Sequence, residues 1–227
     1  MFKLKNKNWY VNIYMVIDLK NKKTKALGFI FILILFLLAG FLYIKIYKDS
    51  SSKNVEKIST VDNIKSYGYS LNSNASKYYE DLFKELKEIL NKDSVNEQDY
   101  AKKISQLYVT DLFTLSNKIT SSDVGGVQFV YKDFEEDFIS IAQTSLYSNV
   151  KSNVYGDRKQ QLPEVSEVVV LETAQKDFKY KDTTFENSYY INVEIKYKKD
   201  MGYPTKYQVV ISKNDKNLEV VKSGELK

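Results

Sequence analysis

The sequence predicts an α+β protein in which an N-terminal transmembrane helix precedes three helices packed on a curved antiparallel sheet of about four strands. Three observations lead to this prediction: a long uncharged apolar run near the N-terminus, amphipathic patterns with helical spacing between residues 73 and 150, and alternating apolar and polar residues after residue 164. Helices followed by strands, without regular alternation of the two, are typical of the α+β class.

The apolar run covers residues 26–44 (ALGFIFILILFLLAGFLYI) and contains no charged residue. A helix of this length extends about 28 Å, close to the thickness of the hydrocarbon core of a bilayer. The run is longer than the apolar part of a secretory signal peptide, and no small-x-small cleavage site follows it. We therefore predict an uncleaved transmembrane helix over residues 26–46.

The distribution of lysines around this run predicts its orientation. Residues 1–25 hold seven lysines, whereas the first twenty or so residues after the run hold four. The positive-inside rule then makes residues 1–25 a cytoplasmic tail of a single-pass cell-membrane protein, with the C-terminal domain outside. The apolar and aromatic stretch 9–19 fits a segment on the inner membrane surface, a short disordered tail, or an over-long start whose true initiator is Met15 instead of Met1.

The remaining chain is predicted to be a linker followed by one domain. Residues 47–66 are rich in serine, lysine and asparagine and have little apolar content, which is typical of a linker. Residues 67–227 are predicted to form an extracytoplasmic α+β domain. Apolar residues at helical spacing predict its helices over residues 73–90, 97–117 and 132–150, and Asn96-x-x-Asp99 offers a capping arrangement for the second of them.

The strands are predicted from alternation with a period of two. Residues 165–173 are rich in β-branched side chains, and residues 189–197 alternate between apolar and polar side chains. Turn residues at 199–202 and 214–217 separate two further strands, over residues 207–212 and 218–221. Short turns between successive strands indicate an antiparallel meander.

The local motifs give little indication of a phosphate-binding, metal-binding or catalytic site. Gly125 and Gly126 predict a turn before a short strand over residues 127–131, because no Lys-Ser/Thr pair follows them as in a phosphate-binding loop. The acidic residues 135–137 fit the first turn of a helix better than a cation site, since negative charge complements the helix dipole there. Asp133 and Glu135 are candidate catalytic carboxylates without a recognisable partner.

Composition excludes several classes of site. The chain has no cysteine and no histidine, which removes disulfides, the common zinc sites and Ser-His-Asp triads. Residues 49–227 carry a net charge of about −3, so a basic nucleic-acid-binding face is not expected. We predict that the protein is not an enzyme and has no catalytic, cofactor-binding or metal-binding residues, no cofactor and no nucleic-acid partner.

The order of three helices, a long connection and about four antiparallel strands, over Tyr67–Glu225, resembles the nuclear transport factor 2-like fold. With a short tail and one membrane helix, the arrangement is similar to the bitopic scaffold subunits of type IV secretion and conjugation channels. The resemblance implies a protein without catalytic residues that assembles with copies of itself and with other channel subunits. No motif matches position by position, so no functional residue is carried over.

Two functional hypotheses follow. The first is a membrane-anchored structural or interaction protein, a scaffold subunit of a conjugation or type IV secretion-like complex, with the lipid bilayer, other membrane-complex proteins and further copies of itself as partners. The alternative is an extracytoplasmic binding or sensing module with a ligand pocket in the cone of the fold. An open, partly polar cone favours the alternative, and a filled cone favours plain packing.

Overall fold

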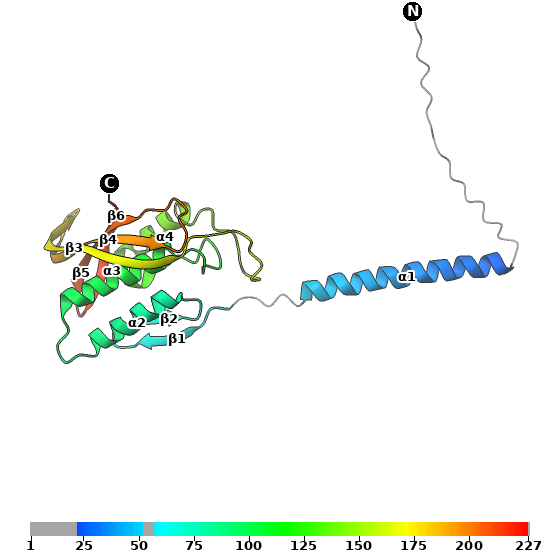
Figure 1. Cartoon of the computed structure of the whole chain (residues 1–227), viewed down its shortest axis with the longest axis horizontal. Coiled ribbons are helices and arrows are strands. Elements are labelled where there is room, and N and C mark those ends of the chain that lie inside the picture. Colours follow the sequence, from blue (N-terminus) through cyan, green and yellow to red (C-terminus); the bar gives the residue numbers. More distant parts are fainter. Residues whose placement is uncertain (1–21, 52–56, 227) are drawn as a thin grey trace, which may run out of the picture. The chain divides into compact units, whose positions relative to one another are not determined.

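A computed structural model describes residues 22–51 and 57–226 of the chain (Figure 1). The chain divides into two compact units, residues 1–54 and 55–227, and each is considered by itself. The predictions for the tail before residue 22, including the stretch 9–19 and the alternative start at Met15, lie outside the described residues.

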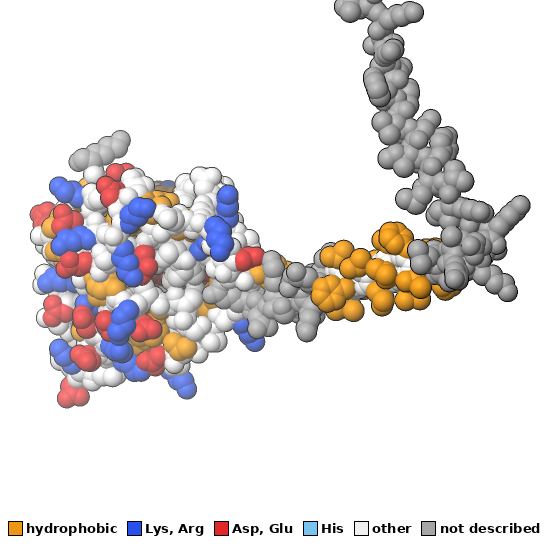
Figure 2. Space-filling model, turned by 45° about the vertical axis from the view of Figure 1, so that its right-hand side comes forward, with side chains coloured by type: hydrophobic (Ala, Val, Ile, Leu, Met, Phe, Trp, Pro, Cys, Tyr) orange, Lys and Arg blue, Asp and Glu red, His pale blue; other side chains and the backbone are white. Residues whose placement is uncertain are grey.

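The first unit contains helix α1, Lys22–Ser51. Its described side chains, those of residues 29–44, are almost all apolar, and the large ones are 47–76% exposed. They lie on all sides of the helix instead of forming one stripe, since the large apolar side chains of residues 29–38 and 41–44 are all exposed. Figure 2 shows one face of this helix in orange. A surface of this kind, defined here as the apolar surface of α1, normally contacts another apolar phase or partner.

The predicted transmembrane helix over residues 26–46 is corrected by the structure. No helix among the described residues is both long enough and apolar enough to cross a membrane. The 19 uncharged residues that led to the prediction correspond to about 28 Å of helix, at the short end of what spans the ~30 Å of a hydrocarbon core.

The second unit begins with a hairpin whose first strand lies within the predicted linker, residues 47–66, and whose second strand lies within the predicted domain. Strands β1, Thr60–Ile64, and β2, Tyr69–Asn72, pair antiparallel as a separate two-stranded sheet. The hairpin places Ile64, Tyr69 and Leu71 in the core. The strand was missed because β1 buries only one of its five residues, which leaves no alternating pattern.

Two amphipathic helices follow. Helix α2 spans Lys77–Leu90 and starts four residues later than predicted, because the Ser76 side chain accepts a hydrogen bond from the Tyr79 N–H and so caps the helix there. Helix α3 spans Glu97–Phe113, and Asn96 caps it as predicted, with its Oδ1 3.1 Å from the Asp99 nitrogen. The apolar faces of both helices are buried.

The segment after α3 differs from the prediction. Residues 127–131 were expected to be a strand, but Val127–Phe129 forms the 3-10 turn η1, and only one bridge joins Val130 to Val220. A second 3-10 turn, η2 over Lys132–Phe134, leads into helix α4, Glu135–Thr144. Helix α4 is therefore much shorter than the predicted helix 132–150.

Residues 145–164 connect α4 to the sheet without a helix or strand. The single arginine of the chain, Arg158, holds this connection by donating to three carbonyl oxygens. Its guanidinium lies 2.7 Å from Ser116 O, 2.7 Å from Lys118 O and 3.1 Å from Lys151 O. The connection is thereby tied to the segment that follows α3.

The main sheet is an antiparallel meander in the order β3-β4-β5-β6, with bounds Val165–Tyr180, Thr183–Tyr197, Lys206–Asn214 and Asn217–Glu225. The predicted strands lie inside these bounds, but β3 and β4 are much longer than expected. Register shifts interrupt the β3–β4 ladder at three places. Such bulges bend a strand and increase its twist.

The helices and the sheet form two layers around one main core. Helix α3 contacts all four strands of the meander, and α2 lies against α3 (Figure 1). A smaller cluster of buried apolar side chains joins the outer end of the β3–β4 hairpin to β5 and β6: Phe178, Phe185, Val210 and Val221. The second unit is thus of the α+β class, with separate helical and antiparallel parts.

Candidate functional site

An open pocket of about 350 Å³ lies between α3, α4 and the sheet. We call it the amphipathic pocket, because apolar walls enclose a small group of hydroxyls. It falls within the size range of small-molecule sites, which starts at about 300 Å³. Its lining comes from α3, the η2–α4 segment, the end of β3, and strands β5 and β6: Tyr108, Leu112, Val130, Phe134, Asp137, Phe138, Ile141, Ala142, Ser145, Leu146, Tyr180, Tyr207, Val220, Val221, Lys222 and Ser223.

The hydroxyl group of the pocket is built by three elements. Tyr108 projects from the buried face of α3, and its hydroxyl lies 2.8 Å from Ser223 Oγ on β6. The Tyr207 hydroxyl on β5 lies 3.3 Å from the same oxygen. Strand pairing brings these residues together, because Val209 lies opposite Ser223 and Tyr207 opposite Glu225.

Burial keeps these phenols neutral. Removal from water raises the pKa of Tyr108 well above its usual range, and it also raises the pKa of Tyr207. At neutral pH both side chains therefore donate or accept hydrogen bonds and do not act as bases. The cluster is suited to recognising a polar group, whereas proton abstraction would require a base that it lacks.

The apolar walls include surface that remains in contact with water. Ile141 of α4 is 65% exposed and Tyr180 near the end of β3 is 42% exposed, although both line the pocket. The Phe134 ring lies edge-on to Tyr180 at 5.1 Å, and the Phe138 ring lies 5.9 Å from Tyr108. These rings give the pocket a firm apolar wall with an open side.

Two charged residues belong to the open side. Asp137 comes from the first turn of α4, and Lys222 comes from β6; both are exposed and both line the pocket. The Lys222 ammonium also lies 5.9 Å from the centre of the Phe178 ring. A ligand that leaves the apolar interior would meet one cation and one anion at the opening.

A second, smaller cavity of about 80 Å³ lies between the hairpin, α2, the C-terminal half of α3 and the Gly125–Gly126 loop. We call it the polar cavity. At its edge Lys118, only 4% exposed, donates to Asp111 Oδ1 at 2.5 Å. Its lining is almost entirely polar: Ser70, Asn72, Asn74, Ala75, Ser76, Tyr79, Thr110, Asp111, Thr114, Asn117, Lys118, Asp123, Val124, Gly125 and Gln128.

The glycine pair forms part of this polar cavity, and the turn predicted there is present. Gly126 adopts a left-handed conformation with φ of 80°, and its N–H donates to Asp111 Oδ2 at 2.7 Å. The Gly125 N–H donates to the Tyr147 hydroxyl at 2.9 Å. A Cβ added to Gly125 would lie 2.1 Å from the Asp111 carbonyl oxygen. Since both N–H groups are engaged, the loop does not present them to a phosphate.

The acidic residues singled out in the sequence lie apart from both cavities, except Asp137. Residues 135–137 occupy the first turn of α4, as predicted. Glu135 pairs with Lys132 at 2.7 Å, and Asp133 is exposed. Within residues 22–51 and 57–226, no group of three or more acidic side chains is arranged to hold a metal ion.

Sequence reasoning did not identify the amphipathic pocket. Tyr108 was part of the apolar stripe of α3, where a core role is the default, and the chain has 19 tyrosines. Tyr207 and Ser223 lie in strands without a motif. The only signal in the sequence was the hydroxyl of Tyr108 on a core-facing side chain. This hydroxyl indicates a site only once the fold places Tyr207 of β5 and Ser223 of β6 next to it.

Comparison with known proteins finds no matching family model, no similar curated protein and no similar solved structure.

Proposed function

We propose that the protein is a binding module whose amphipathic pocket takes a small, largely apolar molecule with one hydrogen-bonding end. The observation that carries this proposal is the open 350 Å³ pocket with the Tyr108–Ser223–Tyr207 hydroxyls among apolar walls. An open and partly polar pocket is the feature that favours a binding module over plain packing.

The apolar walls and the hydroxyls of the pocket would contribute to ligand binding in different ways. Apolar contact with Phe134, Phe138 and Ile141 would supply affinity, at about 25 cal/mol for each Å² of apolar surface removed from water. The three hydroxyls would fix orientation, because a ligand without a polar end would leave their remaining hydrogen-bonding capacity unused. Lys222 favours a ligand with an acidic or strongly polar end, and Asp137 reduces that preference.

The test is binding of an apolar fluorescent anion, anilinonaphthalene sulfonate, to the full-length chain, with decanoate as a competitor. Ser145 lines the pocket and is exposed, so Ser145→Phe would fill the opening with little cost to the core. Ser148, also exposed, is outside the lining, and Ser148→Phe is the matched control. We expect Ser145→Phe alone to reduce decanoate-sensitive binding by about tenfold.

The apolar surface of α1 contributes equal background in all three proteins, so only the difference between variants reports on the pocket. Equal decanoate-sensitive binding by the wild type, Ser145→Phe and Ser148→Phe would contradict the proposal. A loss of binding in both variants would also contradict it, since Ser148 does not line the pocket.

We propose as a second candidate a structural or interaction protein that is held at the cell membrane. The apolar surface of α1 favours it, because exposed apolar area of this extent is normally covered by lipid or by partner proteins. The resemblance in element order to a nuclear transport factor 2-like scaffold subunit of a conjugation or type IV secretion complex supports the same role. Fractionation of cells tests it: recovery of the full chain in the supernatant without detergent would count against it.

A further inference from the structure

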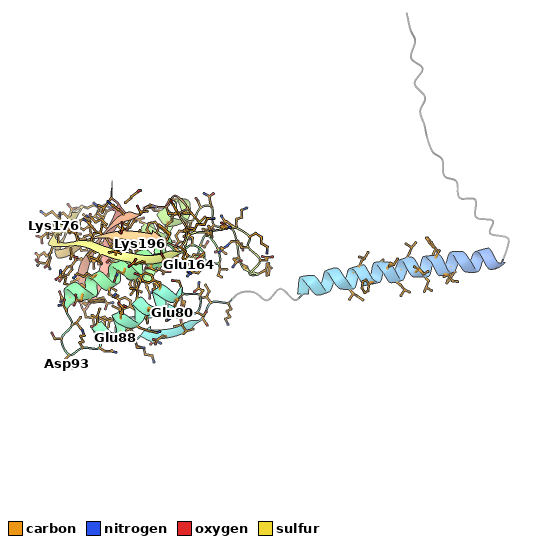
Figure 3. The ribbon with its side chains drawn as sticks, viewed as in Figure 1. Glu80, Glu88, Asp93, Glu164, Lys176 and Lys196 are labelled. Carbon is orange, nitrogen blue, oxygen red and sulfur yellow. The ribbon has the colours of Figure 1, made fainter. Side chains whose placement is uncertain are left out.

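Strand β3 forms one edge of the main sheet, and part of this edge is free. At Val168 the edge is closed, because the Val168 N–H donates to the Tyr78 hydroxyl at 2.9 Å and the Val168 oxygen accepts from Gln106 at 2.8 Å. Further along, no described residue outside β4 bonds to the backbone of residues 172–176. Figure 3 labels Lys176 near the end of β3 opposite to Glu164. An exposed edge of this kind is a template for another strand.

The free edge has a symmetric pattern. Register shifts occur between Val170 and Glu172 and between Lys176 and Phe178, so residues 172–176 (ETAQK) form a regular segment bounded by two irregularities. Its first residue is acidic, its last is basic, and Ala174 is its centre. Both charged side chains are exposed, and neither forms an ion pair among the described residues: Glu172 accepts a hydrogen bond from Asn192 Nδ2 at 3.0 Å, and the Lys176 ammonium lies 4.3 Å from the centre of the Tyr190 ring.

We propose that two copies of this chain pair antiparallel through residues 172–176, around a two-fold axis at Ala174. In this register Glu172 of each copy lies opposite Lys176 of the other, and Thr173 lies opposite Gln175. Opposite charges directly across an antiparallel pair stabilise it, and like charges destabilise it. Because the interface is isologous, both charge pairs form at once. Two four-stranded sheets then become one continuous sheet.

The surroundings of the edge leave room for this pairing. A groove of about 580 Å³ runs between α2, α3 and residues 167–170, beside the free segment. The groove lies beyond the register shift between Val170 and Glu172, so it adjoins one end of the paired segment. Residues 171–177 are exposed except for half-buried Thr173.

The pairing is expected to be weak in dilute solution. Five residue pairs bury far less than the ~1,200 Å² of a stable interface. A dissociation constant in the micromolar range or weaker follows, and confinement of the chains to a common surface would strengthen the pairing. The proposal is independent of the ligand in the amphipathic pocket.

Disulfide trapping tests the register directly, because the chain has no cysteine of its own. In full-length Ala174→Cys, the two thiols meet across the axis and are expected to cross-link at least ten times faster than in Gln175→Cys. In the proposed register Gln175 lies opposite Thr173 of the other copy, two residues away from the second Gln175. The Cα atoms of the two Gln175 residues are therefore beyond the ~7 Å limit for a disulfide. Equal rates for the two variants would overturn the proposal.

Charge exchange provides the second test, measured by sedimentation equilibrium of the full-length chain in mild detergent. Glu172→Lys or Lys176→Glu alone places like charges opposite each other twice, and each is expected to weaken self-association by about tenfold. The double variant E172K/K176E, or a mixture of the two single variants, restores opposite charges and is expected to recover the wild-type association.

Two outcomes would overturn the proposal here. One is identical association of all variants, as expected if α1 alone drives it. The other is a monomeric wild type at every concentration, as expected if the edge receives an extended peptide from a different protein. Circular dichroism of each variant separates a folding defect from a loss of pairing, and the mixture restores association only if both variants are folded.

Discussion

The amphipathic pocket and the polar cavity share helix α3 but differ in how their polar atoms are satisfied. Tyr108 and Asp111 lie three residues apart, so one turn of α3 serves both places. Around the polar cavity, most buried groups are engaged with one another: Asp111 with Lys118 and Gly126, and Tyr147 with Gly125, whereas Asn117 Oδ1 has no partner among the described residues. In the amphipathic pocket, the Ser223 hydroxyl contacts those of Tyr108 and Tyr207, and the rest of the lining is largely apolar and open on one side. A largely closed polar network is typical of a structural part, and an open amphipathic pocket of a binding site.

The largest expected effect is on the ion pair of the polar cavity. Asp111→Ala removes one partner of a pair whose other member, Lys118, has a side chain that is 5% exposed. The free energy of unfolding should fall by about 3–5 kcal/mol, because a buried ammonium is left without its partner. Denaturant unfolding measures this loss.

The matched control for Asp111→Ala is Glu167→Ala. The Glu167–Lys196 pair has a similar separation, 2.8 Å against 2.5 Å, but both of its side chains are about half exposed. Its loss should change stability by less than about 1 kcal/mol. Equal losses in the two variants would mean that the polar cavity is more open to water than the contacts indicate.

The next effect concerns the glycine loop. Gly125→Ala brings a methyl group to 2.1 Å from the Asp111 carbonyl oxygen, so the loop must move away from α3. A loss of about 1–3 kcal/mol is expected from such overpacking. Gly224→Ala, which meets no atom within 4 Å, is the control and should be neutral to within about 0.5 kcal/mol. Thermal unfolding of both variants, with a loss confined to Gly125→Ala, would support the structural role of the loop.

Two buried tyrosines, one beside the polar cavity and one in the amphipathic pocket, allow the most direct comparison of the two regions. The Tyr147 hydroxyl bonds to Gly125 N and donates to Leu112 O at 2.8 Å, so Tyr147→Phe leaves two backbone groups unsatisfied and should cost about 1–3 kcal/mol. Tyr108→Phe leaves Ser223 with its contact to the Tyr207 hydroxyl at 3.3 Å and should cost about 1 kcal/mol or less. Binding of the fluorescent probe should change in Tyr108→Phe and stay constant in Tyr147→Phe. The reverse pattern would assign binding to the polar cavity.

The smallest expected effect is that of pH on stability, which is absent near neutrality and begins only at alkaline pH. Burial raises the pKa of Tyr100 to about 12, and it also raises the pKa of Tyr108 and Tyr147. Below pH 10 the phenols are protonated in both folded and unfolded chains, so stability does not depend on them. Above pH 10 the unfolded chain loses these protons first, and each phenol lowers stability by about 1.4 kcal/mol per pH unit until its folded pKa is reached.

Tyrosinate absorbance during alkaline titration measures this effect. Half-buried Tyr207 should ionise before fully buried Tyr147. Simultaneous ionisation of both, before the protein unfolds, would remove the proposed difference in solvent access between the two regions.

Much of the second unit could be predicted from periodicity, and the failures have identifiable causes. Helix α3 begins where Asn96 predicts, and the predicted strands lie within β3–β6. The outer half of the β3–β4 hairpin was missed because its residues are mostly exposed and polar. The transmembrane prediction for residues 26–46 was wrong on the described part of α1, because it rested on the absence of charge over a run of marginal length.

The candidate site was less predictable than the fold. The pocket depends on contacts such as Tyr108 with Ser223, which are 115 residues apart in the chain. Local spacing contains no information about such pairs. The glycine loop was correctly predicted as a turn, but the close approach of Gly125 to Asp111 follows only from tertiary packing.

Arg158 shows how composition and architecture constrain each other. The chain has lysine at every other basic position, and its one guanidinium lies where a single head group donates to three carbonyl oxygens in fixed directions. The connection over residues 145–164 has no helix or strand, but it is a poor place for insertions, tags or circular permutation. Lengthening it would move the Arg158 guanidinium away from the carbonyl oxygens to which it donates.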